Sequence, residues 1–149
     1  MRTLKIFITA GILLGVSVVA FGGASFFIQR VECCPNVIKI STYLECPGYV
    51  YVFVAAPDSD NYYLIYPSCP EENRLLCTCW QKTLGYWRLG KAGVYRFIFM
   101  VTTTPIQWCP GKIETFYDML WRAKNILWII EGMVKTYQDI TPYYWTRVY

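Results

Sequence analysis

The stretch Gly48-Tyr-Val-Tyr-Val-Phe-Val-Ala-Ala56 decides the fold class that we expect for this chain. Its six central residues, 49–54, are all aromatic or β-branched, and such side chains are favoured in β-strands. Apolar side chains occupy both alternating sets of positions, so neither face of the strand is suited to water. We therefore predict a strand that is central in its sheet or covered on both sides, with Val52 or Val54 in the interior.

Comparable runs on both sides of this stretch predict a mainly β domain that covers residues 31–110. The longest run, 93–104, follows a glycine-containing turn and ends before a proline. The other predicted strands are 37–43, 61–66, 74–80 and 84–89. Because no helical pattern separates these strands, the simplest architecture is a small antiparallel β-sandwich or barrel.

The chain has seven cysteines, and all of them follow an apolar N-terminal run. Such clustering is typical of an exported domain that is held by disulfide bonds in an oxidising compartment. Adjacent cysteines can bond each other only through a strained ring, so we expect Cys33 and Cys34 to have different partners. An odd number leaves at least one thiol unpaired or bonded to another chain. The disulfide candidates are Cys33, Cys34, Cys46, Cys69, Cys77, Cys79 and Cys109.

A thiolate metal site is the competing hypothesis for the same cysteines. Cys33-Cys34 together with Cys77-Thr-Cys79 would supply the sulfur ligands. Zinc-binding cysteines are usually separated by two to four residues and are often accompanied by histidine, whereas this chain has no histidine. We therefore prefer disulfide bonds, keep a redox or metal protein with cysteine ligands alone as an alternative, and expect no cofactor.

Residues 1–30 are predicted to form a membrane anchor helix or a signal peptide. The run 6–28 contains no charged residue, and a helix of that length rises about 34 Å, enough to cross a bilayer core of about 30 Å. An uncleaved anchor is the preferred hypothesis, and a cleaved secretory signal is the alternative. The basic start favours a cytoplasmic N-terminus and an extracytoplasmic C-terminal domain. The candidate contacts with another membrane helix, which would share one helix face, are Gly11, Gly15 and Gly22.

Residues 111–149 are predicted to form an amphipathic helix followed by an aromatic tail. At 100° per residue, the apolar side chains between 112 and 139 fall on one face of a helix and most charged side chains on the other. A row of Tyr117, Trp121 and Trp128 interrupts the charged face. Because a solvated face does not normally carry such a row, we expect it to be covered by the β domain or a loop, by a partner subunit, or by the membrane interface, where Trp and Tyr are favoured.

The composition argues against most kinds of catalytic and metal site and against nucleic-acid binding. The absence of histidine removes most metal, general-base and nucleophile–base arrangements, and a scattered net charge of +4 indicates no nucleic-acid partner. We therefore predict a non-enzymatic, single-pass membrane subunit without a small-molecule substrate. Its extracytoplasmic, disulfide-bonded β domain would contact other protein subunits in a larger complex beside the bilayer. The alternative is a secreted structural subunit of a surface filament or envelope after its leader is removed.

Overall fold

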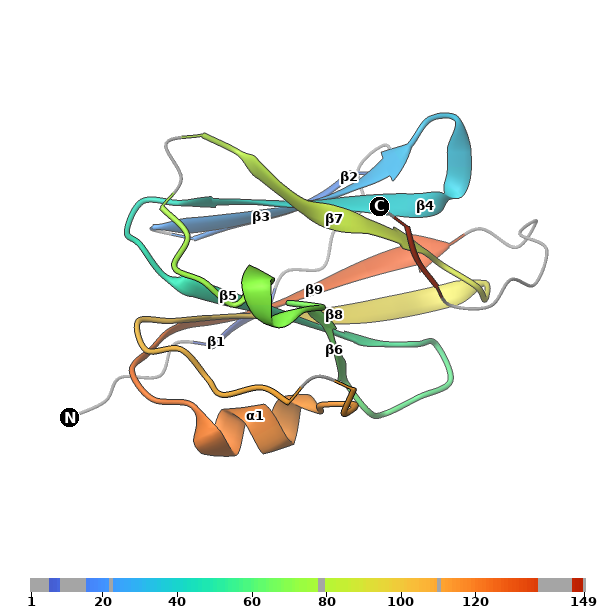
Figure 1. The fold of residues 1–149 in the computed structure, drawn as a ribbon. Helices are drawn as coiled ribbons and strands as arrows, with labels where there is room; N and C mark the ends of the chain where they lie inside the picture. The colour runs from blue at the N-terminus through green and yellow to red at the C-terminus, as the bar shows by residue number, and fades with distance from the viewer. Residues whose placement is uncertain are drawn as a thin grey trace.

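The computed structural model describes residues 6–8, 16–21, 23–77, 80–109, 111–136 and 146–148. They form two sheets that lie face to face, with one short helix below the lower sheet (Figure 1). The first sheet contains, in spatial order, β1 (Ile6–Ile8), β9 (Ile126–Thr136), β8 (Gly93–Thr102), β5 (Tyr49–Ala55) and β6 (Tyr63–Tyr66). The second contains β2 (Val16–Phe21), β3 (Ala24–Val31), β4 (Cys34–Leu44), β7 (Lys82–Arg88) and β10 (Thr146–Val148). The predicted mainly β fold is confirmed.

Strand β5 is covered on both faces, as its sequence predicts. It pairs with β6 on one side and with β8 on the other, both antiparallel. Val52 and Val54 both belong to the core between the two sheets. The alternate residues Tyr51 and Phe53 belong to a second apolar cluster on the outer face of the first sheet. Two apolar faces on one strand therefore reflect two separate cores.

The outer cluster is covered by α1 (Phe116–Arg122) and by the segment that leads to it. A closed set of hydrogen bonds ties this cover to the sheet. The Tyr51 hydroxyl donates to Asn73 Oδ1 at 2.8 Å and accepts from the Ile106 backbone N–H at 2.8 Å. The Asn73 side-chain amide donates to the Ile106 carbonyl at 2.9 Å. Burial raises the pKa of Tyr51, so this hydroxyl stays protonated and keeps its donor role.

The long C-terminal helix predicted for 112–139 is wrong. The helix ends at Arg122, and Asn125 adopts a left-handed conformation with φ of 55° before β9 begins. The β9 sequence is rich in isoleucine and other residues that strands favour, and it pairs with β8 along nearly its whole length, from Thr102↔Ile126 to Gly93↔Thr136. This pairing and the burial of alternate side chains outweigh the helical periodicity.

The continuous helix predicted for 6–28 is also wrong in the part that the structure describes. Residues 16–21 and 24–31 form the antiparallel pair β2–β3, in which Phe21 pairs with Ala24. β3 then pairs with β4. No helix among the described residues has the length and apolar character to span a membrane. Gly11, Gly15 and Gly22 lie outside the described residues.

In the described part of the predicted strand 74–80, residues 74–77 and 80, one bridge takes the place of a strand. Leu76 pairs with Gly48 through two backbone hydrogen bonds, and a short 3-10 helix, η1 (Pro70–Glu72), precedes it. The bridge requires a close approach at Gly48, since a Cβ atom there would lie 2.6 Å from Val101 Cγ1. Glycine at this position therefore lets the connection between β4 and β5 lie against β8.

Candidate functional site

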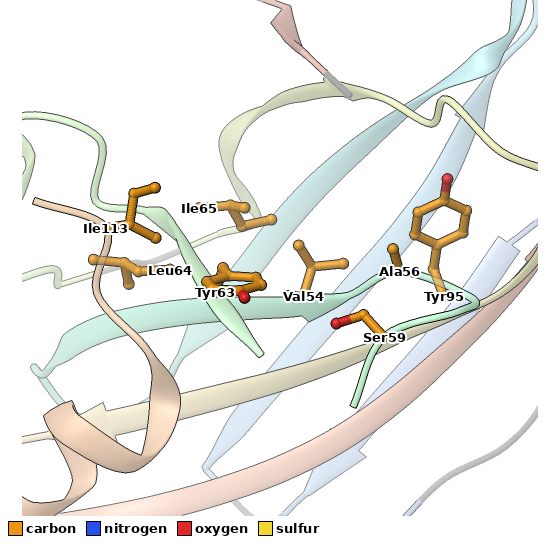
Figure 2. Close-up of a pocket in the computed structure, with 8 residues that line it drawn as sticks. All are labelled: Val54, Ala56, Ser59, Tyr63, Leu64, Ile65, Tyr95 and Ile113. Atoms are coloured by element: carbon orange, nitrogen blue, oxygen red, sulfur yellow. The ribbon is translucent and has the colours of Figure 1, made fainter. Parts of the chain in front are cut away.

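An apolar pocket of about 440 Å³ opens at the β6 edge of the first sheet (Figure 2). β6 is only four residues long, so it extends the sheet over a short distance and leaves part of the inner faces of β5 and β8 open beside it. The connection between β5 and β6 and the segment before α1 complete the wall. The lining residues are Val54, Ala56, Ser59, Tyr63, Leu64, Ile65, Tyr95 and Ile113.

Two of the three side-chain hydroxyls that line this pocket, those of Tyr95 and Ser59, are engaged within the protein, and the third belongs to Tyr63. The Tyr95 hydroxyl accepts a hydrogen bond from the Lys91 backbone N–H at 2.8 Å, and burial raises the pKa of Tyr95. Ser59 Oγ accepts from the Asn61 backbone N–H at 3.1 Å. Among the described residues that line the pocket, none is charged and none is a cysteine. Its chemistry therefore suits an apolar group better than a reacting one.

Exposed apolar side chains continue from the pocket onto α1. Ile113, at the pocket wall, is 75% exposed, and Tyr117 and Trp121 on α1 are 66% and 92% exposed. Residues four apart on a helix lie on one side of it, so the two aromatic rings face the same way. On the opposite side, Phe116 and Met119 are buried in the outer cluster. We call Ile113, Tyr117 and Trp121 the α1 aromatic surface.

Backbone pairing sets the position of this surface beside the pocket. Leu64 N–H donates to the Glu114 carbonyl at 2.8 Å, and Phe116 N–H donates to the Tyr62 carbonyl at 3.0 Å. The segment before α1 thus adds to the β6 edge like a short extra strand. The Thr115 side chain caps the helix by accepting from Asp118 N–H at 3.3 Å. Caps of this kind stabilise a helix start by about 1 kcal/mol.

One ion pair connects the start of α1 to its end. Arg122 Nη2 lies 2.9 Å from Glu114 Oε2, and the Glu114 side chain is fully buried whereas that of Arg122 is 36% exposed. The other oxygen, Glu114 Oε1, has no hydrogen-bond partner among the described residues. A buried carboxylate without a partner is costly, so Arg122 is the group that makes this burial tolerable.

The three aromatic residues predicted to share one helix face are separated. Tyr117 and Trp121 lie on α1, exposed and next to each other, so no described part of the chain covers them. Trp128 lies on β9, is half-buried and packs against the core between the sheets. It lines a second hollow, of about 290 Å³, at a different place on the domain. The prediction of partner contacts at Tyr117 and Trp121 stays a prediction.

The cysteines do not form the predicted framework in the described part of the chain. Six of them have free thiols, namely Cys33, Cys34, Cys46, Cys69, Cys77 and Cys109, and Cys79 lies outside the described residues. Physical separation explains part of this result. Cys34 begins β4, and Cys77 follows the bridge to Gly48 beyond the other end of that strand. The 11 residues of β4 are joined by ten steps of about 3.3 Å each, which puts its ends roughly 33 Å apart.

The same separation excludes the predicted four-sulfur site from Cys33-Cys34 and Cys77-Thr-Cys79. No group of three or more potential metal ligands occurs among the residues with described positions.

Sequence analysis did not identify the pocket or Ile113. The pocket is assembled from four separate segments, and each contributes ordinary apolar residues whose pattern is fully explained by strands and turns. Ile113 follows Gly111-Lys112, and a single apolar residue in a loop is normal on protein surfaces. No protein-family model matches the chain, and no curated protein and no solved structure is significantly similar to it.

Proposed function

We propose that this protein is a non-enzymatic binding subunit that contacts another protein through the α1 aromatic surface and the adjoining pocket. The observation that carries the proposal is Trp121, which is 92% exposed although its helix is packed on the opposite side. Tyr117 and Ile113 extend the exposed apolar area towards the pocket. Tryptophan and tyrosine are the side chains that most often dominate the binding energy of protein interfaces.

The pocket gives the proposed interface a place for an anchor. Its volume of about 440 Å³ and its apolar wall suit a large apolar side chain of the partner, which would lose its contact with water on entering. The hydroxyls of Tyr95 and Ser59 are held by backbone groups, and the described residues of the wall include no carboxylate, amine or thiol that could act as a general base beside the Tyr63 hydroxyl. This supports a binding role over an enzymatic one.

The location of the protein stays a prediction. Membrane attachment with an extracytoplasmic domain and a secreted structural subunit both stay hypotheses, and residues 16–21 and 24–31 form strands and not the anchor helix on which the first was based. A partner subunit at the α1 aromatic surface is compatible with both, because this surface lies on the first sheet, whereas the apolar segments 16–21 and 24–31 belong to the second sheet.

Matched tryptophan substitutions test the proposal in the full chain. Trp121→Ala and Trp80→Ala each remove an exposed tryptophan, since Trp80 is 77% exposed and lies outside the α1 aromatic surface. Cross-linking and gentle purification from the native source should recover a defined partner with the wild type and with Trp80→Ala. Recovery should fall at least tenfold with Trp121→Ala, because central aromatic anchors often contribute 2 kcal/mol or more. Equal recovery with all three chains would refute the proposed interface.

A second variant examines the junction between the pocket and the α1 aromatic surface. Ile113→Asp places a charge at the junction of the pocket and the α1 aromatic surface, at a side chain that is 75% exposed. It should leave the folded domain intact and reduce partner recovery, because an unpaired carboxylate would be desolvated in the interface. Light scattering of the purified wild type shows whether the partner is a second copy of the chain.

A further inference from the structure

The turn between β3 and β4 holds two adjacent cysteines whose thiols are in contact. Cys33 is exposed, and Cys34 is half-buried at the first position of β4, where it pairs with Val31. Their sulfur atoms lie 3.4 Å apart. Side chains of adjacent residues on an extended strand point to opposite faces, so it is the turn that brings these two sulfurs to the same side.

No other described cysteine lies near this pair in the fold. Cys46 and Cys77 lie beyond the opposite end of β4. Cys69 precedes η1, and Cys109 lies in the segment that leads to α1. The two sulfurs of the turn therefore have each other as their partners, and any ion that needs two thiolates from the described part of the chain meets them here.

The distance between the two sulfur atoms can be compared with the spacing that different chelated ions require. With a sulfur–ion bond of about 2.3 Å, a linear ion requires sulfurs about 4.6 Å apart and a tetrahedral ion about 3.8 Å. The observed 3.4 Å corresponds to an angle of about 95° at the ion. A pyramidal trivalent metalloid, such as arsenic(III), prefers angles near this value.

We propose that Cys33 and Cys34 form a dithiol site that binds trivalent, thiophilic metalloid ions, with arsenic(III) as the representative. A direct disulfide between adjacent cysteines closes a strained ring around one peptide bond. Insertion of one arsenic atom between the sulfurs enlarges that ring by an atom and removes the need for the sulfurs to approach bonding distance. The pair is thus better arranged to chelate an ion than to bond to itself.

A surface hollow beside Cys33 leaves room for the third substituent on the ion. It has a volume of about 410 Å³, and its wall includes Cys33, Tyr86, Val31 and the charged residues Arg30, Glu32 and Lys39. An aromatic substituent on arsenic would lie in this hollow, where Tyr86 and Val31 offer apolar contacts. The site therefore accepts an organic arsenical as well as the inorganic ion.

The reaction with the hydrated form of phenylarsine oxide balances without an oxidant or a reductant. Two arsenic–oxygen bonds break and two arsenic–sulfur bonds form, one to Cys33 and one to Cys34. Each thiol proton leaves with a hydroxyl group as water, and arsenic remains trivalent. The adduct keeps the phenyl group, so it adds a defined mass to the chain.

The test measures binding of phenylarsine oxide to the reduced full chain by intact mass spectrometry with peptide mapping, in the presence of excess monothiol. The adduct should map to the peptide with Cys33 and Cys34. Cys33→Ser and Cys34→Ser should each weaken binding at that peptide by roughly 100-fold or more, because the second bond of a chelate forms at high effective concentration. Cys46→Ser and Cys77→Ser are the matched controls and should bind as the wild type.

Two results would overturn the proposal. One is an adduct at the same peptide that Cys33→Ser leaves unchanged, since a single thiol would then suffice. The other is an adduct that appears only on other cysteines and is lost with Cys77→Ser. Thermal unfolding of each variant checks the fold. If Cys34→Ser is unstable, the exposed Cys33→Ser substitution decides the question, because the side chain of a surface turn residue contributes little to the core.

Discussion

Replacement of Arg122 by methionine should destabilise the protein far more than its surface position indicates. The guanidinium lies 2.9 Å from a carboxylate whose side chain is fully buried. Methionine keeps the length and apolar contacts of the arginine stem but removes the charge. Glu114 would then remain buried in the outer part of the fold without its ion-pair partner.

The structure sets the size of this effect. At 2.9 Å, the attraction between unit charges is about 1.4 kcal/mol in water and about 6 kcal/mol at an effective dielectric constant of 20. Removal of one partner from a fully buried pair typically costs about 3–5 kcal/mol. Because Arg122 is 36% exposed, solvent screens part of the interaction, and we expect a loss of about 2–4 kcal/mol in the free energy of unfolding.

Urea denaturation followed by tryptophan fluorescence measures this loss, and a double-mutant cycle assigns it. Glu114→Gln removes the buried charge, so Arg122→Met in that background should cost less than about 1 kcal/mol. Lys124→Met is the control for an exposed cation next to the same helix and should change stability by no more than about 0.5 kcal/mol. One contradicting result is a loss of free energy of unfolding for Arg122→Met that is no larger than the loss for the Lys124→Met control. The other is an equal loss for Arg122→Met in the presence and in the absence of the Glu114 carboxylate. Either result would show that the buried ion pair does not stabilise α1.

Three further predictions concern the packing of the two cores and of α1. Trp121→Ala should change the free energy of unfolding by no more than about 0.5 kcal/mol. Phe116→Ala, at a side chain only 7% exposed, should lower the free energy of unfolding by about 3–5 kcal/mol. Similar losses for the two variants in thermal or urea unfolding would show that Trp121 is not a free surface residue. Gly48→Ala should cost about 1–3 kcal/mol by overpacking, since its Cβ would lie 2.6 Å from Val101 Cγ1, and Val101→Ala should recover part of that loss in the double variant. Val52→Asp should prevent accumulation of folded protein, because an unpaired carboxylate in the core costs several kcal/mol, and normal soluble yield with an unchanged circular dichroism spectrum would contradict the position of this strand.

Local sequence was enough to predict the strands that are buried on both sides. The run 48–56 has apolar residues at every position of its central part, and no helix can bury such a pattern on one face. It was also enough to single out Tyr117 and Trp121, because large aromatic residues among charged ones are conspicuous in any conformation. Both residues lie on the short helix α1, four positions apart, whereas their contact with a partner stays a prediction.

The same local signals failed where one segment satisfies two periodicities. Residues 126–136 have apolar side chains that fit one face of a helix, yet Ile129 and Ile130 pack on opposite sides of the sheet, in the outer and inner cores. A strand buries both, whereas a helix on the surface would bury one face alone. The strand that pairs with this segment, β8, is distant in the sequence. Thr102 pairs with Ile126, 24 residues later, and Gly93 pairs with Thr136, 43 residues later.

In the N-terminal apolar run, too, the sequence predicts burial but does not determine what buries the residues. Its lack of charge predicts burial away from water, and lipid and protein core satisfy that requirement equally. For 24–31 the structure supplies a protein core, because β4 offers backbone hydrogen bonds and the first sheet covers Ala24, Phe26 and Ile28. Composition thus established that these residues avoid water and that the domain is mainly β. Tertiary contacts alone decided which surface buries these residues and where the pocket opens, because both depend on segments that are distant in the sequence. Tertiary contacts also decided that Glu114 meets Arg122, because this ion pair depends on where helix α1 begins and ends.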